Sequence, residues 1–87
     1  MTKFVVRIDK RVYKELSKLL PKHLNQIKED LESLSSNPRP QDCRKLKVSG
    51  GYRITTGEYR ILYTIDDQQK VVSVYRIVKR NDFSYRD

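Results

Sequence analysis

The sequence predicts an α+β fold in which a two-helix hairpin packs on one face of a small antiparallel sheet, in the order β-α-α-β-β-β. After a short N-terminal strand, the apolar residues of the first half recur at the 3.6-residue period of helices. Those of the second half alternate with polar residues, as in strands. The period changes at a turn-rich loop, residues 35–40. The other face of the sheet is left open for function.

The helical half begins with a half-buried strand over residues 3–8, followed by Asp9, a good helix N-cap. Proline suits the first turn of a helix, so Pro21 should open a second helix. Each helix has one apolar stripe that can face the sheet. The stripes comprise Val12, Leu16, Leu19 and Leu20 in the first helix, and Leu24, Ile27, Leu31 and Leu34 in the second.

The second half is predicted to be a meander of three strands. The first starts at residues 45–48 and resumes after Gly50-Gly51 at residues 52–55, and the others cover residues 59–65 and 70–79. A two-residue loop at Thr56-Gly57 would place Arg53 opposite Arg60 and Thr55 opposite Glu58. Such a pair of like charges is tolerated if solvent screens it or if an anion lies between the two arginines. A longer loop would offset the pair.

Size and charge restrict the possible functions. The 87 residues are 37% hydrophobic and 34% charged, which predicts one domain over residues 1–87 and only a shallow active site. A net charge of +8 and a pI of about 9.8 favour a polyanionic partner. No segment resembles a signal peptide or a membrane span, so a soluble cytoplasmic protein is expected. One cysteine and one histidine exclude an internal disulfide and a structural zinc site.

The C-terminal segment combines basic and aromatic residues. Arg76, Lys79 and Arg80 end the last strand, and Phe83 and Tyr85 follow. Guanidinium groups neutralise phosphate, and a tyrosine ring can stack on an unpaired base, so this segment suggests RNA binding. The alternatives are structural: Phe83 would close the core, and Arg80 would pair with an acidic neighbour.

Several motifs lie in these strands and just after them: Lys45-Leu46-Lys47, Gly51-Tyr52-Arg53-Ile54, Gly57-Glu58-Tyr59-Arg60-Ile61-Leu62-Tyr63, Val74-Tyr75-Arg76-Ile77, Arg80-Asn81-Asp82 and Tyr85. Together they resemble the RelE branch of the RelE/ParE toxin superfamily. The resemblance implies the toxin of a toxin–antitoxin pair. It also implies an endoribonuclease that cuts mRNA in the ribosomal A site by 2′-OH attack on the adjacent phosphate, without metal or cofactor.

The resemblance also implies roles for individual residues. Arg60 would hold the phosphate, Arg80 would protonate or stabilise the leaving oxygen, and Tyr85 would stack on the scissile nucleotide. Arg53 stands where RelE has the first of two lysines, and Thr55 stands at the second. Because arginine keeps its proton and threonine is no base, the general base is unassigned. Glu58 is one candidate, with a salt bridge to Arg60 as its alternative role.

Partners follow from the same resemblance and from charge. The expected partners are the ribosome with mRNA in its A site and an acidic, partly disordered antitoxin, through which alone DNA would be contacted. Basic residues outside the scissile site are expected to contact RNA or the antitoxin: Arg44, Lys45, Lys47, Arg76 and Lys79. His23 is expected to lie away from the site. The alternatives are a ParE-like, non-enzymatic inhibitor of DNA gyrase and an RNA-binding module without catalysis.

Overall fold

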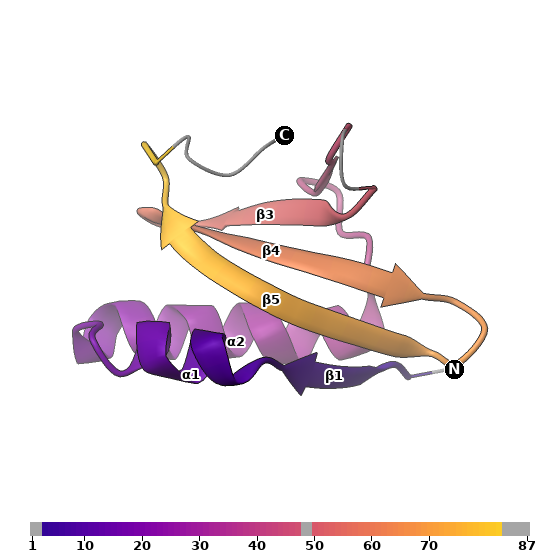
Figure 1. Ribbon diagram of the computed structural model, residues 1–87, viewed down its shortest axis with the longest axis horizontal. Coiled ribbons are helices and arrows are strands. Elements are labelled where there is room, and N and C mark those ends of the chain that lie inside the picture. Colours follow the sequence, from indigo (N-terminus) through magenta and orange to yellow (C-terminus); the bar gives the residue numbers. More distant parts are fainter. Residues whose placement is uncertain (1–2, 48–49, 83–87) are drawn as a thin grey trace.

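Two helices lie against the same face of a five-stranded sheet, as Figure 1 shows. The computed structural model describes residues 3–47 and 50–82. The elements are β1 (Val5–Ile8), α1 (Lys10–Leu16), α2 (Pro21–Ser36), β2 (Arg44–Lys45), β3 (Tyr52–Thr56), β4 (Tyr59–Asp66) and β5 (Val71–Lys79). The predicted α+β class and the order of helices and strands are confirmed.

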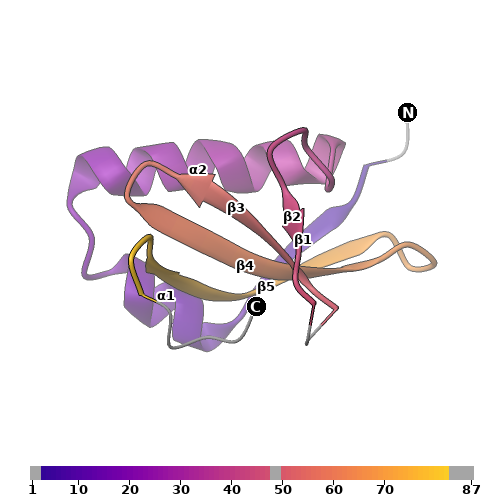
Figure 2. The same cartoon turned by 90° about the horizontal axis from the view of Figure 1, so that it is seen from above.

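The helices begin where the sequence predicts. The Asp9 side chain accepts a hydrogen bond of 2.9 Å from the Arg11 amide, and Pro21 occupies the first turn of α2. α1 ends at Leu16, so Leu20 does not belong to its apolar stripe; it is the N-cap of α2 and is 62% exposed. The chain reverses between the helices, and α2 runs back along the sheet (Figure 2).

The sheet is mixed, with the strand order β1-β5-β4-β3-β2. The pairs β2–β3, β3–β4 and β4–β5 are antiparallel. β1 instead pairs parallel with β5, with Val5 opposite Val71. The predicted wholly antiparallel sheet is therefore wrong at β1. The alternation of residues 3–8 indicates which face is buried, but it carries no information about the partner strand or its direction.

Residues 44–45 form a strand of their own instead of the start of β3. Arg44 pairs with Arg53 and Lys45 with Tyr52, in antiparallel register. The chain reverses between them, and Gly50 adopts a φ of 75°, which glycine accepts without steric cost. Gly50-Gly51 therefore lies between two separate strands, β2 and β3, where one interrupted strand was predicted.

The β3–β4 hairpin turns at Gly57-Glu58, one residue later than predicted. Gly57 has a φ of 59° at the first turn position, where a type II′ turn requires glycine. Thr56 remains in the strand and pairs with Tyr59. Thr55 therefore lies opposite Arg60, and Arg53 lies opposite Leu62, so the predicted Arg53–Arg60 and Thr55–Glu58 pairs are wrong.

The core fills the space between the helices and the sheet. Its largest fully buried side chain is Tyr63, whose hydroxyl donates a hydrogen bond of 2.8 Å to the Pro38 carbonyl. Burial raises the pKa of Tyr63, so the hydroxyl keeps the proton that it donates. On the opposite face, Leu62 and Val78 are also buried, and they form an apolar floor there.

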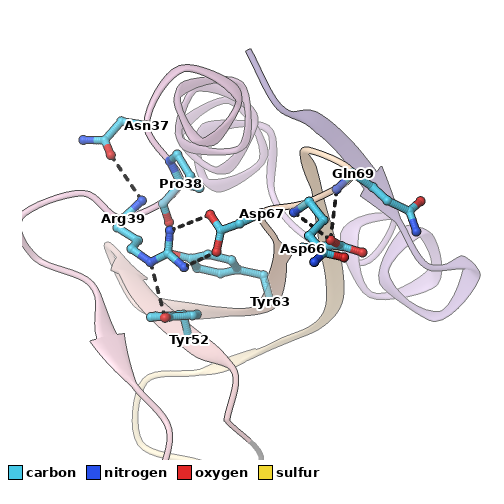
Figure 3. Close-up of polar contacts among 9 residues, drawn as sticks. Asn37, Pro38, Arg39, Tyr52, Tyr63, Asp66, Asp67 and Gln69 are labelled. Atoms are coloured by element: carbon cyan, nitrogen blue, oxygen red, sulfur yellow. Dashed lines mark hydrogen bonds and ion pairs between the residues drawn. The ribbon is translucent and has the colours of Figure 1, made fainter. Parts of the chain in front are cut away.

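A cluster of polar contacts connects the loop after α2 to the residues that follow β4, as Figure 3 shows. Arg39 makes two hydrogen bonds to the Asp67 carboxylate, of 3.1 and 2.8 Å, and its Nε donates to the Tyr52 hydroxyl at 3.3 Å. The guanidinium also lies 5.3 Å from the centroid of the Tyr52 ring. We refer to Arg39, Tyr52 and Asp67 as the Arg39 cluster.

Within the described ranges, no helix is long and apolar enough to cross a membrane.

Candidate active site

A pocket of about 680 Å³ lies where the β3–β4 turn meets the end of β5. Figures 1 and 2 both show these two segments at the same end of the sheet. The pocket is lined by Glu58, Tyr59, Arg60, Lys79, Arg80 and Asn81. Four of these were predicted as site residues, namely Glu58, Arg60, Lys79 and Arg80. The fold therefore brings together two segments that lie about twenty residues apart in the chain.

Strand pairing assembles this pocket. Tyr59 pairs with Lys79 and Arg60 with Val78, so the start of β4 lies beside the end of β5. Just beyond the paired residues, the Arg80 amide donates a hydrogen bond of 2.7 Å to the Glu58 carbonyl. This bond links the turn to the chain that leaves β5. The positions of Glu58 and Arg80 are therefore coupled through the backbone.

The charges in the pocket suit an anion with a reactive proton nearby. Arg60, Lys79 and Arg80 are cationic, and Glu58 is the only acidic residue among the described residues of the lining. Arg60 is half-buried on the helix-free face with its Nε shielded from solvent, whereas Glu58 and Arg80 are exposed. Guanidinium groups in such a place can hold a phosphate, and a carboxylate can accept a proton.

Arg53 and Arg44 lie on the same face as Arg60 but outside the pocket lining. They are direct cross-strand partners on β2 and β3, so the structure does contain a pair of facing arginines, with a different partner from the one predicted. Lys45 pairs with Tyr52, and strand alternation directs it to the other face. Lys47 is exposed after β2.

Arg76 has a structural contact. Its Nε lies 3.9 Å from Glu15 Oε2, and Oε1 of the same carboxylate accepts a 3.0 Å hydrogen bond from the Ile77 amide at the edge of β5. Glu15 thereby satisfies a strand amide beyond the end of β1. Tyr85 and Phe83, which were predicted to stack on RNA or to close the core, lie outside the described residues.

Tyr59 and Asn81 line the pocket although neither was predicted as a site residue. Tyr59 belongs to the helix-facing side of β4, where an aromatic residue is expected to be core, and Asn81 follows the last strand. His23 lies closer to the pocket than predicted, because its ring contacts Tyr59 edge-on with 5.3 Å between centroids. The position of Tyr59 directly before Arg60 in the sequence does not distinguish a pocket residue from a core residue.

The fold and the pocket define a small basic protein with an arginine-lined cleft at one end of its sheet. The sequence model of the ParE toxin of type II toxin–antitoxin systems matches residues 3–82. The chain therefore belongs to this toxin family, and its similar proteins place it on the RelE branch.

Three relatives illustrate the likeness. A protein of Methanocaldococcus jannaschii that bears the name RelE1 is 37% identical over 82 residues, which cover 90% of this chain and 91% of that protein. The archaeal RelE–RelB complex from Pyrococcus horikoshii has a TM-score of 0.83 and 31% identity, covering 93% of this chain and 98% of the other. The toxin–antitoxin complex RelBE2 of Mycobacterium tuberculosis has a TM-score of 0.79 and 30% identity, covering 90% and 99%.

Proposed function

We propose that this toxin is a ribosome-dependent mRNA endoribonuclease that cleaves in the A site and so inhibits translation. The observation that carries the proposal is the pocket in which Glu58, Arg60 and Arg80 converge from two segments of the chain. Similarity to proteins named RelE supports the same conclusion.

The reaction requires three tasks of the protein. A base accepts the proton of the 2′-OH, positive charge stabilises the phosphorane, and an acid or cation serves the leaving 5′ oxygen. Arg60 is assigned to the phosphate, because it is held half-buried at the pocket wall. Arg80 is assigned to the leaving oxygen. Arg53, which lies outside the lining, is assigned to the neighbouring stretch of substrate, and Tyr85 to stacking on the scissile base.

Glu58 is proposed as the general base. Thr55, at the second lysine position of the family, has no group that accepts a proton at neutral pH. Within residues 3–47 and 50–82, Glu58 is the single carboxylate that lines the pocket, and its backbone carbonyl accepts a hydrogen bond from the Arg80 amide. The pocket therefore offers a base beside the group that serves the leaving oxygen.

Two further proposals concern partners and location. The solved relatives from Pyrococcus horikoshii and Mycobacterium tuberculosis are complexes with their antitoxins. We propose for this chain an acidic, partly disordered antitoxin that covers the basic face and folds on binding, because the net charge of +8 favours an anionic partner. The cytoplasm, where ribosomes and mRNA meet, is the proposed compartment.

Primer extension on a defined mRNA in a reconstituted translation reaction tests the nuclease function. Cuts are expected at A-site codons and only when ribosomes are present. Glu58→Gln and Arg80→Ala should each remove most of the cutting while ribosome binding persists. Cutting by wild-type protein without ribosomes, or no cutting by a folded protein, would contradict the proposal. Full activity of Glu58→Gln would return Glu58 to a structural role.

Inhibition of DNA gyrase is the second candidate, because the family model that matches this chain is that of the ParE toxin. This function requires a binding surface and no reacting groups. A supercoiling assay with purified gyrase separates the two candidates. Inhibition that survives Arg80→Ala and Glu58→Gln, without any mRNA cleavage, would favour the gyrase candidate.

A further inference from the structure

Three residues of α2 face the β3–β4 turn from the side opposite the arginines. They lie at helical spacing on one face of α2, near the end of the sheet that holds the pocket: His23, Gln26 and Asp30. His23 contacts the Tyr59 ring, and Asp30 Oδ2 accepts a hydrogen bond of 2.6 Å from Thr56 Oγ1. A Cβ at Gly57 would lie 3.1 Å from Gln26 Oε1, so the turn is pressed closely against the helix.

The contact between Asp30 and Thr56 is the strongest of the three. Thr56 is only 3% exposed, and a buried hydroxyl needs a hydrogen-bond partner. A bond from a hydroxyl to a carboxylate is shorter and stronger than a neutral one. Thr56 is also the last residue of β3 before the turn. The hydrogen bond between Thr56 and Asp30 therefore holds the residue from which the turn begins.

The position of the β3–β4 turn determines where the side chains of the pocket lie. Thr55 pairs with Arg60 and Thr56 with Tyr59, so a displaced β3 end displaces the start of β4. The Glu58 carbonyl holds the Arg80 amide at 2.7 Å, so a displaced turn also moves Arg80. A continuous series of contacts thus leads from Asp30 to Glu58, Arg60 and Arg80.

We propose that Asp30 is a positioning residue for the pocket, acting through Thr56 on the β3–β4 turn. The proposal rests on the nuclease function proposed above, and Asp30 itself lies outside the pocket lining. Loss of the bond should misplace the reacting groups while leaving the charge that attracts RNA. A shift of about 1 Å in reacting groups can cost about a hundredfold in rate. The expected loss is therefore in kcat, with little change in KM.

Kinetics of A-site cleavage on programmed ribosomes test this assignment. Asp30→Ala and Thr56→Val should each lower kcat about tenfold or more. The double variant should lose no more than either single one, because both remove the same bond. Thr56→Ser, which keeps the hydroxyl, should retain most of the rate. Glu29→Ala is the matched control, since it removes an exposed carboxylate from the position directly before Asp30 in the same helix.

A second control separates positioning from stability. Val72→Ala opens a cavity at the other end of β5, where Val72 pairs with Val6 and Ile65, and destabilises the fold without touching the pocket. All variants are assayed at a temperature at which each is folded. A kcat for Asp30→Ala equal to that of Glu29→Ala, or to that of Val72→Ala, would overturn the assignment.

Hydrogen exchange at the Arg80 amide gives a readout that does not need activity. Asp30→Ala should speed exchange at this amide, because the Glu58 carbonyl that it bonds moves with the turn. Val72→Ala should not, at conditions where global unfolding is negligible. Unchanged exchange in Asp30→Ala would contradict the proposal even if cleavage fell. If the wild-type protein does not cleave mRNA, the nuclease function fails while this measurement still decides the role of Asp30.

Discussion

At the scale of single residues, the pocket separates the roles of two arginines. Arg60 lies in a strand, half-buried, with its Nε shielded, whereas Arg80 is exposed just beyond β5. A half-buried guanidinium is held in one orientation, so its forked geometry can matter as much as its charge. The two residues should therefore respond differently to conservative substitution.

Arg60→Lys tests the importance of this geometry. Lysine keeps the positive charge but loses the fork that binds two phosphate oxygens, so Arg60→Lys should retain more cleavage than Arg60→Ala. Single-turnover cleavage of mRNA on programmed ribosomes measures both variants, with circular dichroism to confirm that they fold. Equal losses in the two variants would mean that charge alone does not serve the reaction.

At the scale of elements, the β3–β4 turn depends on one glycine. Gly57 has a φ of 59°, and an added Cβ would lie 3.1 Å from Gln26 Oε1, whereas Gly50 has a φ of 75° and an added Cβ there would meet no described atom within 4 Å beyond its chain neighbours. Both glycines carry conformational strain on substitution, but only Gly57 adds a steric contact.

Gly57→Ala should therefore destabilise the protein more than Gly50→Ala. The left-handed conformation alone costs an alanine about 1–2 kcal/mol, and the contact with Gln26 adds to this at Gly57. Urea denaturation of the two variants measures the difference. Equal free energies of unfolding would show that Gln26 moves aside without cost.

The Arg39 cluster is a second element-scale device, and it depends on pH. Hydrogen bonds from Arg39 lower the pKa of Asp67 below its ordinary value of 3.8. The stabilisation is then complete above the unfolded-state pKa and disappears as the pH falls through the lower folded-state pKa. Because Asp67 is exposed, the effect should be small.

Asp67→Asn should accordingly lower Tm by a constant amount from neutral pH down to about pH 5, and by less and less below the unfolded-state pKa. Thermal melts of both proteins over this pH series measure the difference. A difference that persists in strong acid would show that the cluster does not depend on the carboxylate charge.

Periodicity predicted the elements well, but it did not predict how they pair. Helical stripes led to α1 and α2, and alternation led to β3, β4 and β5. The hairpin register was wrong because it depends on which residue of Thr56-Gly57-Glu58 occupies the first turn position, a matter of backbone conformation. The roles of His23 and Asp30 were invisible for a related reason: they depend on which helix face meets a turn more than twenty residues later.

The pocket was predicted in part. Arg60, Arg80 and Glu58 were identified from charge and resemblance, and the structure brings them to one pocket. Arg53 shares the sheet face of Arg60 but does not line the pocket, and Arg76 contacts Glu15. Tyr59 could not be identified from its sequence pattern, because an aromatic residue on the helix-facing side of a strand has the same pattern whether it is core or pocket wall.

At the scale of the whole molecule, the net charge of +8 should govern association with the proposed partner, the ribosome. Binding to RNA releases counterions, so affinity should fall steeply as salt rises. Arg44→Ala, which removes one of the facing arginines on the helix-free face, should flatten the salt slope by about one unit if it contacts a phosphate. Lys28→Ala, on the exposed side of α2, is the matched control.

Fluorescence binding assays at several salt concentrations measure these slopes. Wild-type and Lys28→Ala proteins should have the same slope, and Arg44→Ala a smaller one. Equal slopes for all three proteins would place Arg44 outside the RNA contact.

The parallel pairing of β1 with β5 also determines when the protein can fold. Val5 pairs with Val71, so β1 cannot pair until β5 has been synthesised. Contacts between residues so far apart in sequence carry a large loop-closure entropy and slow folding. A nascent chain therefore cannot complete this sheet before β5 has been synthesised, and the pocket forms only when the Arg80 amide has reached the Glu58 carbonyl. Under the nuclease function proposed above, the incomplete chain therefore cannot yet act on the ribosome that makes it.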